Sequence, residues 1–192
     1  MTPSELFQAG NLREAIEASL GTVKKSPTDT TARYLLAELL CLAGDLERAD
    51  KQFDTIMQQS PETAMRVTLL RQLVRAETAR QQFYHQGRVP EFLAEVSPVT
   101  RLQLDASIAI READPSRAGT LLEQAEQQRP SVAGNCDGEA FDDMRDMDDM
   151  TASFFEVLTS TGKYYWVPMK DVELIEFHAP ERPIDLVWRR AH

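Results

Sequence analysis

Residues 9–16 read AGNLREAI, and residues 43–50 read AGDLERAD. The glycine, the leucine and the second alanine repeat between the two stretches at one constant offset, and Pro27 and Pro61 repeat at the same offset. Glycine accepts a left-handed backbone without steric cost, which suits a tight reversal between two helices. The spacing therefore predicts a pair of helices that occurs at least twice.

The offset matches the period of the tetratricopeptide repeat, about 34 residues, in which each unit is a helical hairpin. Leu6 and Phe7 would close the first helix, and the apolar residues that follow Asn11 recur at helical spacing. The small Ala15 and Ala49 would let the paired helices approach closely. Such arrays present a concave groove that usually holds a peptide or helix of a partner.

Further copies follow with less regularity. The apolar pattern predicts a long helix from about Glu62 to His85, a break at Gly87–Pro90, and a hairpin formed by residues 99–113 and 118–125. Pro130 ends this hairpin close to two further periods after Pro61. Residues 1–133 are therefore expected to form a degenerate tetratricopeptide-like domain whose third unit is distorted.

The composition changes after Pro130, and residues 134–192 are expected to form a small α+β C-terminal subdomain. The expected parts are a linker over 131–138, an acidic amphipathic helix from Phe141 to Leu158 capped by Gly162, and two or three short strands at 164–167, 172–177 and 184–188. The fold class is therefore mainly α, with a small mixed tail.

The net charge of −10 makes nucleic acid and anionic membranes poor partners. Residues 134–160 carry eight acidic residues against one arginine, a local charge of −7. Cys41 and Cys136 fit neither a zinc motif nor a disulfide framework, so both are read as reduced thiols in the cytoplasm. The N-terminus lacks the pattern of a secretory signal, and no apolar run reaches membrane-spanning length.

The strongest candidate for chemistry is FDDMRDMDDM, residues 141–150. Clustered carboxylates could bind Mg²⁺ or Ca²⁺, and a metal-dependent hydrolase using Asp142, Asp146 and Asp149 is one reading. The segment lacks the glycine and ligand order of a calcium-binding loop, so a solvated acidic face or a docking face is favoured. The docking face would comprise Asp142, Asp143, Asp146, Asp148 and Asp149.

A second candidate surface is the aromatic run Tyr164, Tyr165 and Trp166, which could bind a peptide. Core packing between sheet and helix is the commoner outcome for such a run and is favoured. The three histidines are far apart in sequence and pair with no serine or cysteine nucleophile in a known motif. No cofactor, metal site or catalytic constellation is predicted, and the chain is interpreted as non-enzymatic.

Three stretches carry a family resemblance. They are AELLCLAGDLERADKQFD at 37–54, FDDMRDMDDMTASFFEVLTSTGKYYWVP at 141–168 and RPIDLVWRRA at 182–191. The sequence resembles the ImpE family, also called TagJ or SciE, over essentially its whole length. Members that resemble this chain continue past the third stretch into a further β-rich region, so this chain is a short member or lacks that part.

The resemblance implies a cytoplasmic accessory protein of a type VI secretion system in a Gram-negative bacterium. Such a protein would bind TssB, the small subunit of the contractile sheath, and connect the sheath to the AAA+ ATPase ClpV. The resemblance implies no catalytic residues and transfers no binding residues. The alternative is a generic tetratricopeptide-like scaffold that serves another complex.

Overall fold

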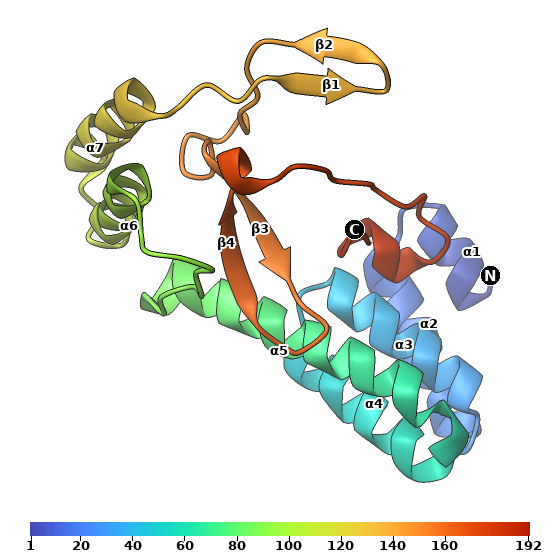
Figure 1. Cartoon of the computed structure of the whole chain (residues 1–192). Coiled ribbons are helices and arrows are strands. Elements are labelled where there is room, and N and C mark those ends of the chain that lie inside the picture. The colour runs from blue at the N-terminus through green and yellow to red at the C-terminus, as the bar shows by residue number, and fades with distance from the viewer. The chain divides into compact units, whose positions relative to one another are not determined.

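The computed structural model describes all 192 residues and consists of helices followed by two small β-hairpins (Figure 1). The helices are α1 (Pro3–Gln8), α2 (Leu12–Lys25), α3 (Thr30–Leu42), α4 (Leu46–Gln59), α5 (Ala64–Gln86), α6 (Pro98–Arg111) and α7 (Pro115–Gln128). The strands are β1 (Gly134–Cys136), β2 (Glu139–Phe141), β3 (Phe154–Leu158) and β4 (Tyr164–Pro168). Three short 3-10 helices are η1 (Pro61–Thr63), η2 (Met169–Asp171) and η3 (Pro183–Leu186).

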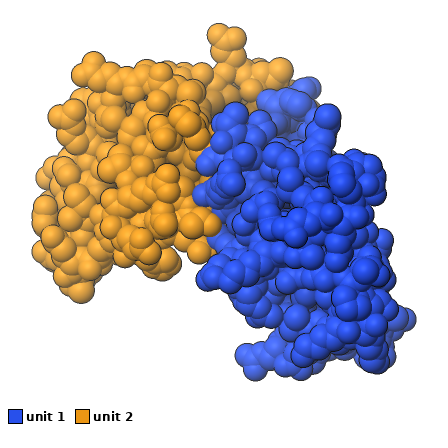
Figure 2. Space-filling model, turned by 90° about the horizontal axis from the view of Figure 1, so that it is seen from below, with its two compact units in different colours: residues 1–75, 160–162, 176–192 blue, residues 76–159, 163–175 orange.

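The chain divides into two compact units, which Figure 2 distinguishes by colour. Unit 1 contains residues 1–75, 160–162 and 176–192, and unit 2 contains residues 76–159 and 163–175. The C-terminal segment therefore folds with the N-terminal helices. The domain boundary that composition suggests at residue 133 stays a prediction.

The repeated turns have the same backbone geometry. Gly10 and Gly44 follow α1 and α3 with φ angles of 81° and 74°. After α1, the amide of Asn11 donates to the carbonyl of Leu6, and the amide of Gly10 donates to Phe7, both at 2.9 Å. This is the Schellman arrangement, which satisfies the last carbonyls of a helix. The same pair of bonds follows α3, where the amides of Asp45 and Gly44 donate to the carbonyls of Leu40 and Cys41. It also follows α6, where the amides of Asp114 and Ala113 donate to the carbonyls of Ala109 and Ile110.

Ala113 occupies the left-handed position of the third turn, with a φ of 59°. A side chain at this φ costs roughly 1 kcal/mol relative to glycine. We therefore expect Ala113→Gly to raise the free energy of unfolding by about 0.5–1 kcal/mol, measured by urea denaturation. The reciprocal Gly44→Ala is expected to lower it by a similar amount. A lower free energy of unfolding in Ala113→Gly would show that the left-handed backbone of Ala113 does not reduce the stability of the chain.

The hairpins of unit 1 pack closely because small residues lie where the helices meet. Ala15 and Ala49 are fully buried, as the sequence predicts for these positions. Phe53 and Ile56 of α4 and Val67 of α5 are also almost fully buried. Consecutive helices form antiparallel pairs along α1–α4, and α6 and α7 form a further pair within unit 2 (Figure 1). The mainly helical, tetratricopeptide-like fold class is confirmed.

The prediction of an acidic helix over residues 141–158 is wrong. This segment is a turn-rich loop, Asp142–Ser153, followed by strand β3. The side-chain oxygen of Asp146 accepts from the amide of Asp148 at 2.8 Å, and that of Asp148 accepts from the amide of Met150 at 2.9 Å. Aspartates that bond to the backbone two residues ahead compete with helix formation, so clustering them favours turns. We call Asp142–Ser153 the acidic loop.

The expected linker over 131–138 contains most of a β-hairpin. Strands β1 and β2 pair in antiparallel register, with Asn135 opposite Ala140. Asp137 and Gly138 connect them with φ angles of 50° and 90°. An Asp-Gly pair with both φ angles positive is the preferred two-residue hairpin turn.

The strand expected at 164–167 is confirmed as part of β4, which pairs antiparallel with β3. Gly162 lies in the turn between these two strands, with a φ of 81°, and does not cap a helix. Residues 172–177 form no strand apart from one bridge between Phe177 and Ala191.

The apolar piece 184–188 is not a strand either, because it begins with the turn η3. Proline at the first position of η3 supplies the φ of a helical turn. The carboxylate of Asp185 accepts from the amide of Arg182 at 2.9 Å, which fixes the start of the turn. As a result Ile184 and Trp188 are buried within unit 1, where η3 packs on α3.

Candidate protein-binding surfaces

The acidic loop of unit 2 is anchored by Arg129, which follows α7. The guanidinium of Arg129 donates two hydrogen bonds to Asp143, at 2.5 and 2.9 Å, and also pairs with Glu126 at 3.0 Å. These bonds, together with the amide of Val132, hold the pKa of the Asp143 carboxyl well below its usual range. Asp143 therefore positions the loop and is not a free docking charge.

We expect Arg129→Gln to loosen this attachment because only 8% of the Arg129 side chain is exposed and its bonds to carboxylates are charge-assisted. The free energy of unfolding should fall by about 1–2 kcal/mol, with faster amide hydrogen exchange across residues 131–150. A matched control is Arg117→Gln, which removes an exposed ion pair with Glu112 and should change little. Equal effects of the two substitutions would contradict the anchoring role.

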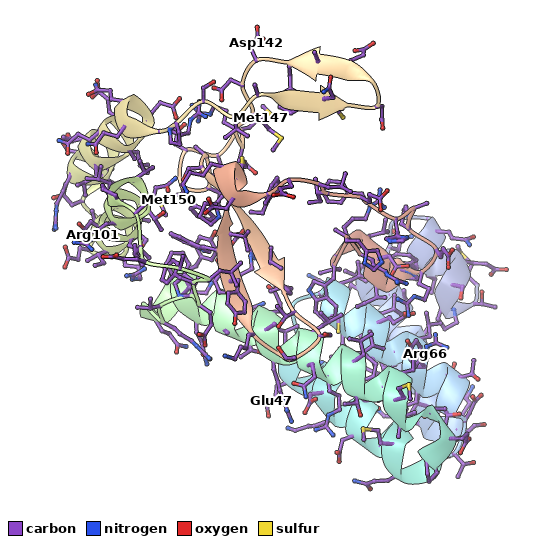
Figure 3. The ribbon with its side chains drawn as sticks, in the orientation of Figure 1. Glu47, Arg66, Arg101, Asp142, Met147 and Met150 are labelled. Atoms are coloured by element: carbon purple, nitrogen blue, oxygen red, sulfur yellow. The ribbon has the colours of Figure 1, made fainter.

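The remaining aspartates of the loop are exposed. Asp149 pairs with Arg145, whereas Asp142, Asp146 and Asp148 have no arginine or lysine within ion-pair distance. Met147, which lies between Asp146 and Asp148 in the sequence, has 99% of its surface exposed and is labelled in Figure 3. The acidic loop thus presents three carboxylates without ion-pair partners and one exposed apolar side chain. Their role in partner binding stays a prediction.

The aromatic run lies on strand β4, where alternate side chains point to opposite faces. Tyr164 and Trp166 are buried, and the Trp166 indole stacks on Phe154 with the ring centres 3.8 Å apart. Phe83 of α5 packs edge-on against Trp166 at 4.8 Å. Tyr165 points the other way and is half-buried. Two of the three aromatic residues thus form core, the arrangement that sequence analysis favours, and only Tyr165 is partly available to a partner.

A polar network crosses this core around Glu156 of β3. Arg80 donates two hydrogen bonds to its carboxylate, at 3.0 and 2.8 Å, and Tyr84 donates one at 3.0 Å. Tyr164 also donates to Glu156 and accepts from the Trp166 indole nitrogen at 2.6 Å. Burial and the charge of Glu156 raise the pKa of both tyrosines, which therefore stay protonated donors. The network fixes the β3–β4 hairpin on α5 and is structural.

Unit 1 contains a polar pocket that sequence analysis does not identify. Its cavity of about 360 Å³ is lined by Tyr34 and Glu38 of α3, Arg66 of α5 and Arg182 of the C-terminal segment. Only 5% of Glu38 is exposed, and one of its carboxylate oxygens has no hydrogen-bond partner. Burial raises the pKa of Glu38 from 4.5 to about 7, against the opposing effect of Arg182 and Arg66. A lone charge within the apolar run LLAELL, residues 35–40, is the signal that could have pointed to it.

No three histidine, cysteine, aspartate or glutamate side chains gather in an arrangement that could hold a metal ion. No helix is both long enough and apolar enough to cross a bilayer.

Comparison with known proteins agrees with this architecture. Residues 138–192 match the family model described as ImpE protein. Residues 6–73 match a tetratricopeptide repeat model, and this match covers the two regular hairpins. Across 98% of its length the chain is 28% identical to the type VI secretion system accessory component TagJ of Pseudomonas aeruginosa.

The family-model match and the similarity to TagJ support a relation of this chain to the ImpE family.

The region that matches the ImpE model includes the acidic loop and the β3–β4 hairpin. The chain spans 66% of the length of the Pseudomonas protein, slightly under two thirds. It also resembles the crystal structure of protein VPA1032 from Vibrio parahaemolyticus, with a TM-score of 0.92 and 28% identity. That similarity covers 97% of this chain and 70% of the Vibrio chain.

Proposed function

We propose that this chain is a non-enzymatic accessory adaptor of a bacterial type VI secretion system. The observation that carries the proposal is its similarity to the TagJ accessory component over nearly its whole length. The tetratricopeptide-like hairpins support a binding role, because such helical arrays act by holding segments of other proteins. An adaptor of this kind works in the cytoplasm.

We further propose that its partner is TssB, the small sheath subunit, and that it connects the sheath to the ClpV ATPase. The docking surface would be the acidic loop, together with Tyr165 on strand β4. Three carboxylates without ion-pair partners, together with the exposed Met147 of the same loop, suit a basic segment that carries an apolar side chain.

The experiment that tests the proposal is isothermal titration calorimetry of this chain against the cognate TssB at low and high salt. Binding at micromolar affinity or tighter is expected, and it should weaken as salt rises because exposed charges are screened. Absence of heat with a folded sheath subunit would overturn the proposal for this chain. Salt-independent binding would exclude the acidic loop as the docking surface and favour an apolar surface.

A variant without three of the acidic-loop charges tests whether this loop is the docking surface. The triple substitution Asp142→Asn, Asp146→Asn and Asp148→Asn removes three charges, yet each asparagine keeps a side-chain oxygen that can accept the turn hydrogen bonds. A matched control replaces the exposed Glu14, Glu17 and Glu62 of unit 1 with glutamine. Only the loop variant should lose affinity, by about tenfold or more.

A further inference from the structure

The pocket of unit 1 holds two groups that lack a counterpart within the chain, a buried acceptor without a donor and a cation without a counter-charge. One is the partnerless oxygen of Glu38, since a buried polar atom without a hydrogen bond is unfavourable and calls for an explanation. The other is Arg66, whose guanidinium has no carboxylate within ion-pair distance. Its Nε donates to the hydroxyl of Tyr34 at 3.2 Å, and its centre lies 4.6 Å from the Tyr34 ring.

The charges of the pocket favour an anionic guest. Arg182 is compensated by Asp185, at 2.8 Å, whereas Arg66 is not compensated. With Glu38 protonated, the surroundings carry a net positive charge within a strongly acidic chain. A protonated carboxyl is a hydrogen-bond donor, so Glu38 could donate to a bound carboxylate. A guest cation would instead meet two guanidinium groups.

The apolar lining and the volume of the pocket indicate which kind of molecule carries the anion. Leu35, Ile56 and Val67 line the same cavity as the charged groups, so apolar side chains next to the anion would be buried with it. A volume of about 360 Å³ is at the small end for ligand pockets and accommodates one side chain with part of its neighbours. A peptide segment supplies both an acidic and an apolar side chain.

We propose that the pocket formed by α3, the start of α5 and Arg182 binds an acidic side chain, flanked by apolar residues, from a partner protein. Arg66 pairs with the guest carboxylate, and Glu38 donates a hydrogen bond to it. This site uses no residue of the acidic loop, and it stands whether or not that loop binds a sheath subunit.

The test uses the peptide acetyl-Ala-Leu-Glu-Leu-Ala-amide and its counterpart with glutamine in place of glutamate. Each is titrated into the full ¹⁵N-labelled chain, and amide shifts are followed by NMR. The glutamate peptide should cause saturable shifts in α3, at residues 63–67 and around Arg182, with a Kd on the order of 1 mM. The glutamine peptide should bind at least tenfold more weakly.

Two variants separate the roles of the pocket residues. Arg66→Gln should weaken binding of the glutamate peptide at least tenfold, whereas the control Arg48→Gln, which alters an exposed ion pair with Asp45, should not.

The wild-type chain should bind the glutamate peptide more tightly at pH 6 than at pH 8.5, because Glu38 must carry a proton to donate. The charged and titratable groups that face Glu38 are Tyr34, Arg66, Arg182 and Asp185. Glu38→Gln keeps a donor at every pH and should bind equally at both.

Three results would overturn the proposal. They are equal responses to the two peptides, shifts that persist in Arg66→Gln, and no shifts at 10 mM peptide, roughly ten times the expected Kd. A pH dependence that remains in Glu38→Gln would remove Glu38 from the site. Amide spectra of the free variants establish that each is folded before titration.

Discussion

Replacement of Trp166 by alanine is expected to lower the free energy of unfolding by about 3–5 kcal/mol. Only 1% of the Trp166 side chain is exposed, and it contacts Phe154 by stacking and Phe83 edge-on. Removing it would leave a cavity in the core of unit 2 and take a donor from the hydroxyl of Tyr164.

The measurement is urea unfolding followed by circular dichroism, which does not depend on the fluorescence of the deleted tryptophan. Tyr165→Ala is the control from the same strand, since its side chain points to the other face and is half-buried. The control should lower the free energy of unfolding by about 1 kcal/mol or less. Similar losses in the two variants would contradict the assignment of Trp166 to the core. A loss of partner binding in Tyr165→Ala alone would support a surface role for Tyr165.

The helical hairpins could be predicted because their determinants are local and repeat in the sequence. A glycine at each turn and a small alanine in each following helix recur at one constant spacing, and the structure has the expected backbone at both turns. The third turn shows that the motif tolerates another residue, since Ala113 adopts the same left-handed conformation. Glycine spacing alone therefore does not reveal that copy, whereas the apolar periodicity of the flanking helices does.

The acidic loop could not be predicted from periodicity, because its apolar residues are compatible with a helical face. The backbone is instead determined by side-chain acceptors, such as Asp146 for the amide of Asp148. A local signal was present in the neighbouring Asp137-Gly138 pair, which marks the β1–β2 hairpin. Turn chemistry, and not amphipathicity, is the better guide to this part of the chain.

The polar pocket shows what sequence spacing cannot reveal. Its charged residues are Glu38, Arg66 and Arg182, and the last of these lies near the C-terminus, far from the other two in sequence. They meet because η3 packs on α3, which depends on the burial of Ile184 and Trp188. A single sequence carries no sign of that long-range contact. Glu38 within an apolar run is visible, but its partners are not.

Glu38 should also make the stability of the chain depend on pH. Its pKa is about 7 in the folded state and 4.5 in the unfolded reference, so the folded chain binds more protons between these values. The stabilising contribution of the proton is therefore complete below about pH 4.5 and is lost as the pH rises through about 7. Above that pH the folded chain buries an ionised carboxylate with a partnerless oxygen.

We therefore expect Glu38→Gln to match the wild-type stability at pH 5 and to exceed it by about 2 kcal/mol at pH 8.5. The measurement is urea unfolding at intervals between these values, with the wild-type free energy subtracted so that other titrating groups cancel. Glu47→Gln, at an exposed position of α4, is the control and should give a difference close to zero at every pH. A constant difference for Glu38→Gln would mean that the Glu38 proton is held equally in both states, and it would also remove the reason to expect proton-linked binding in the pocket.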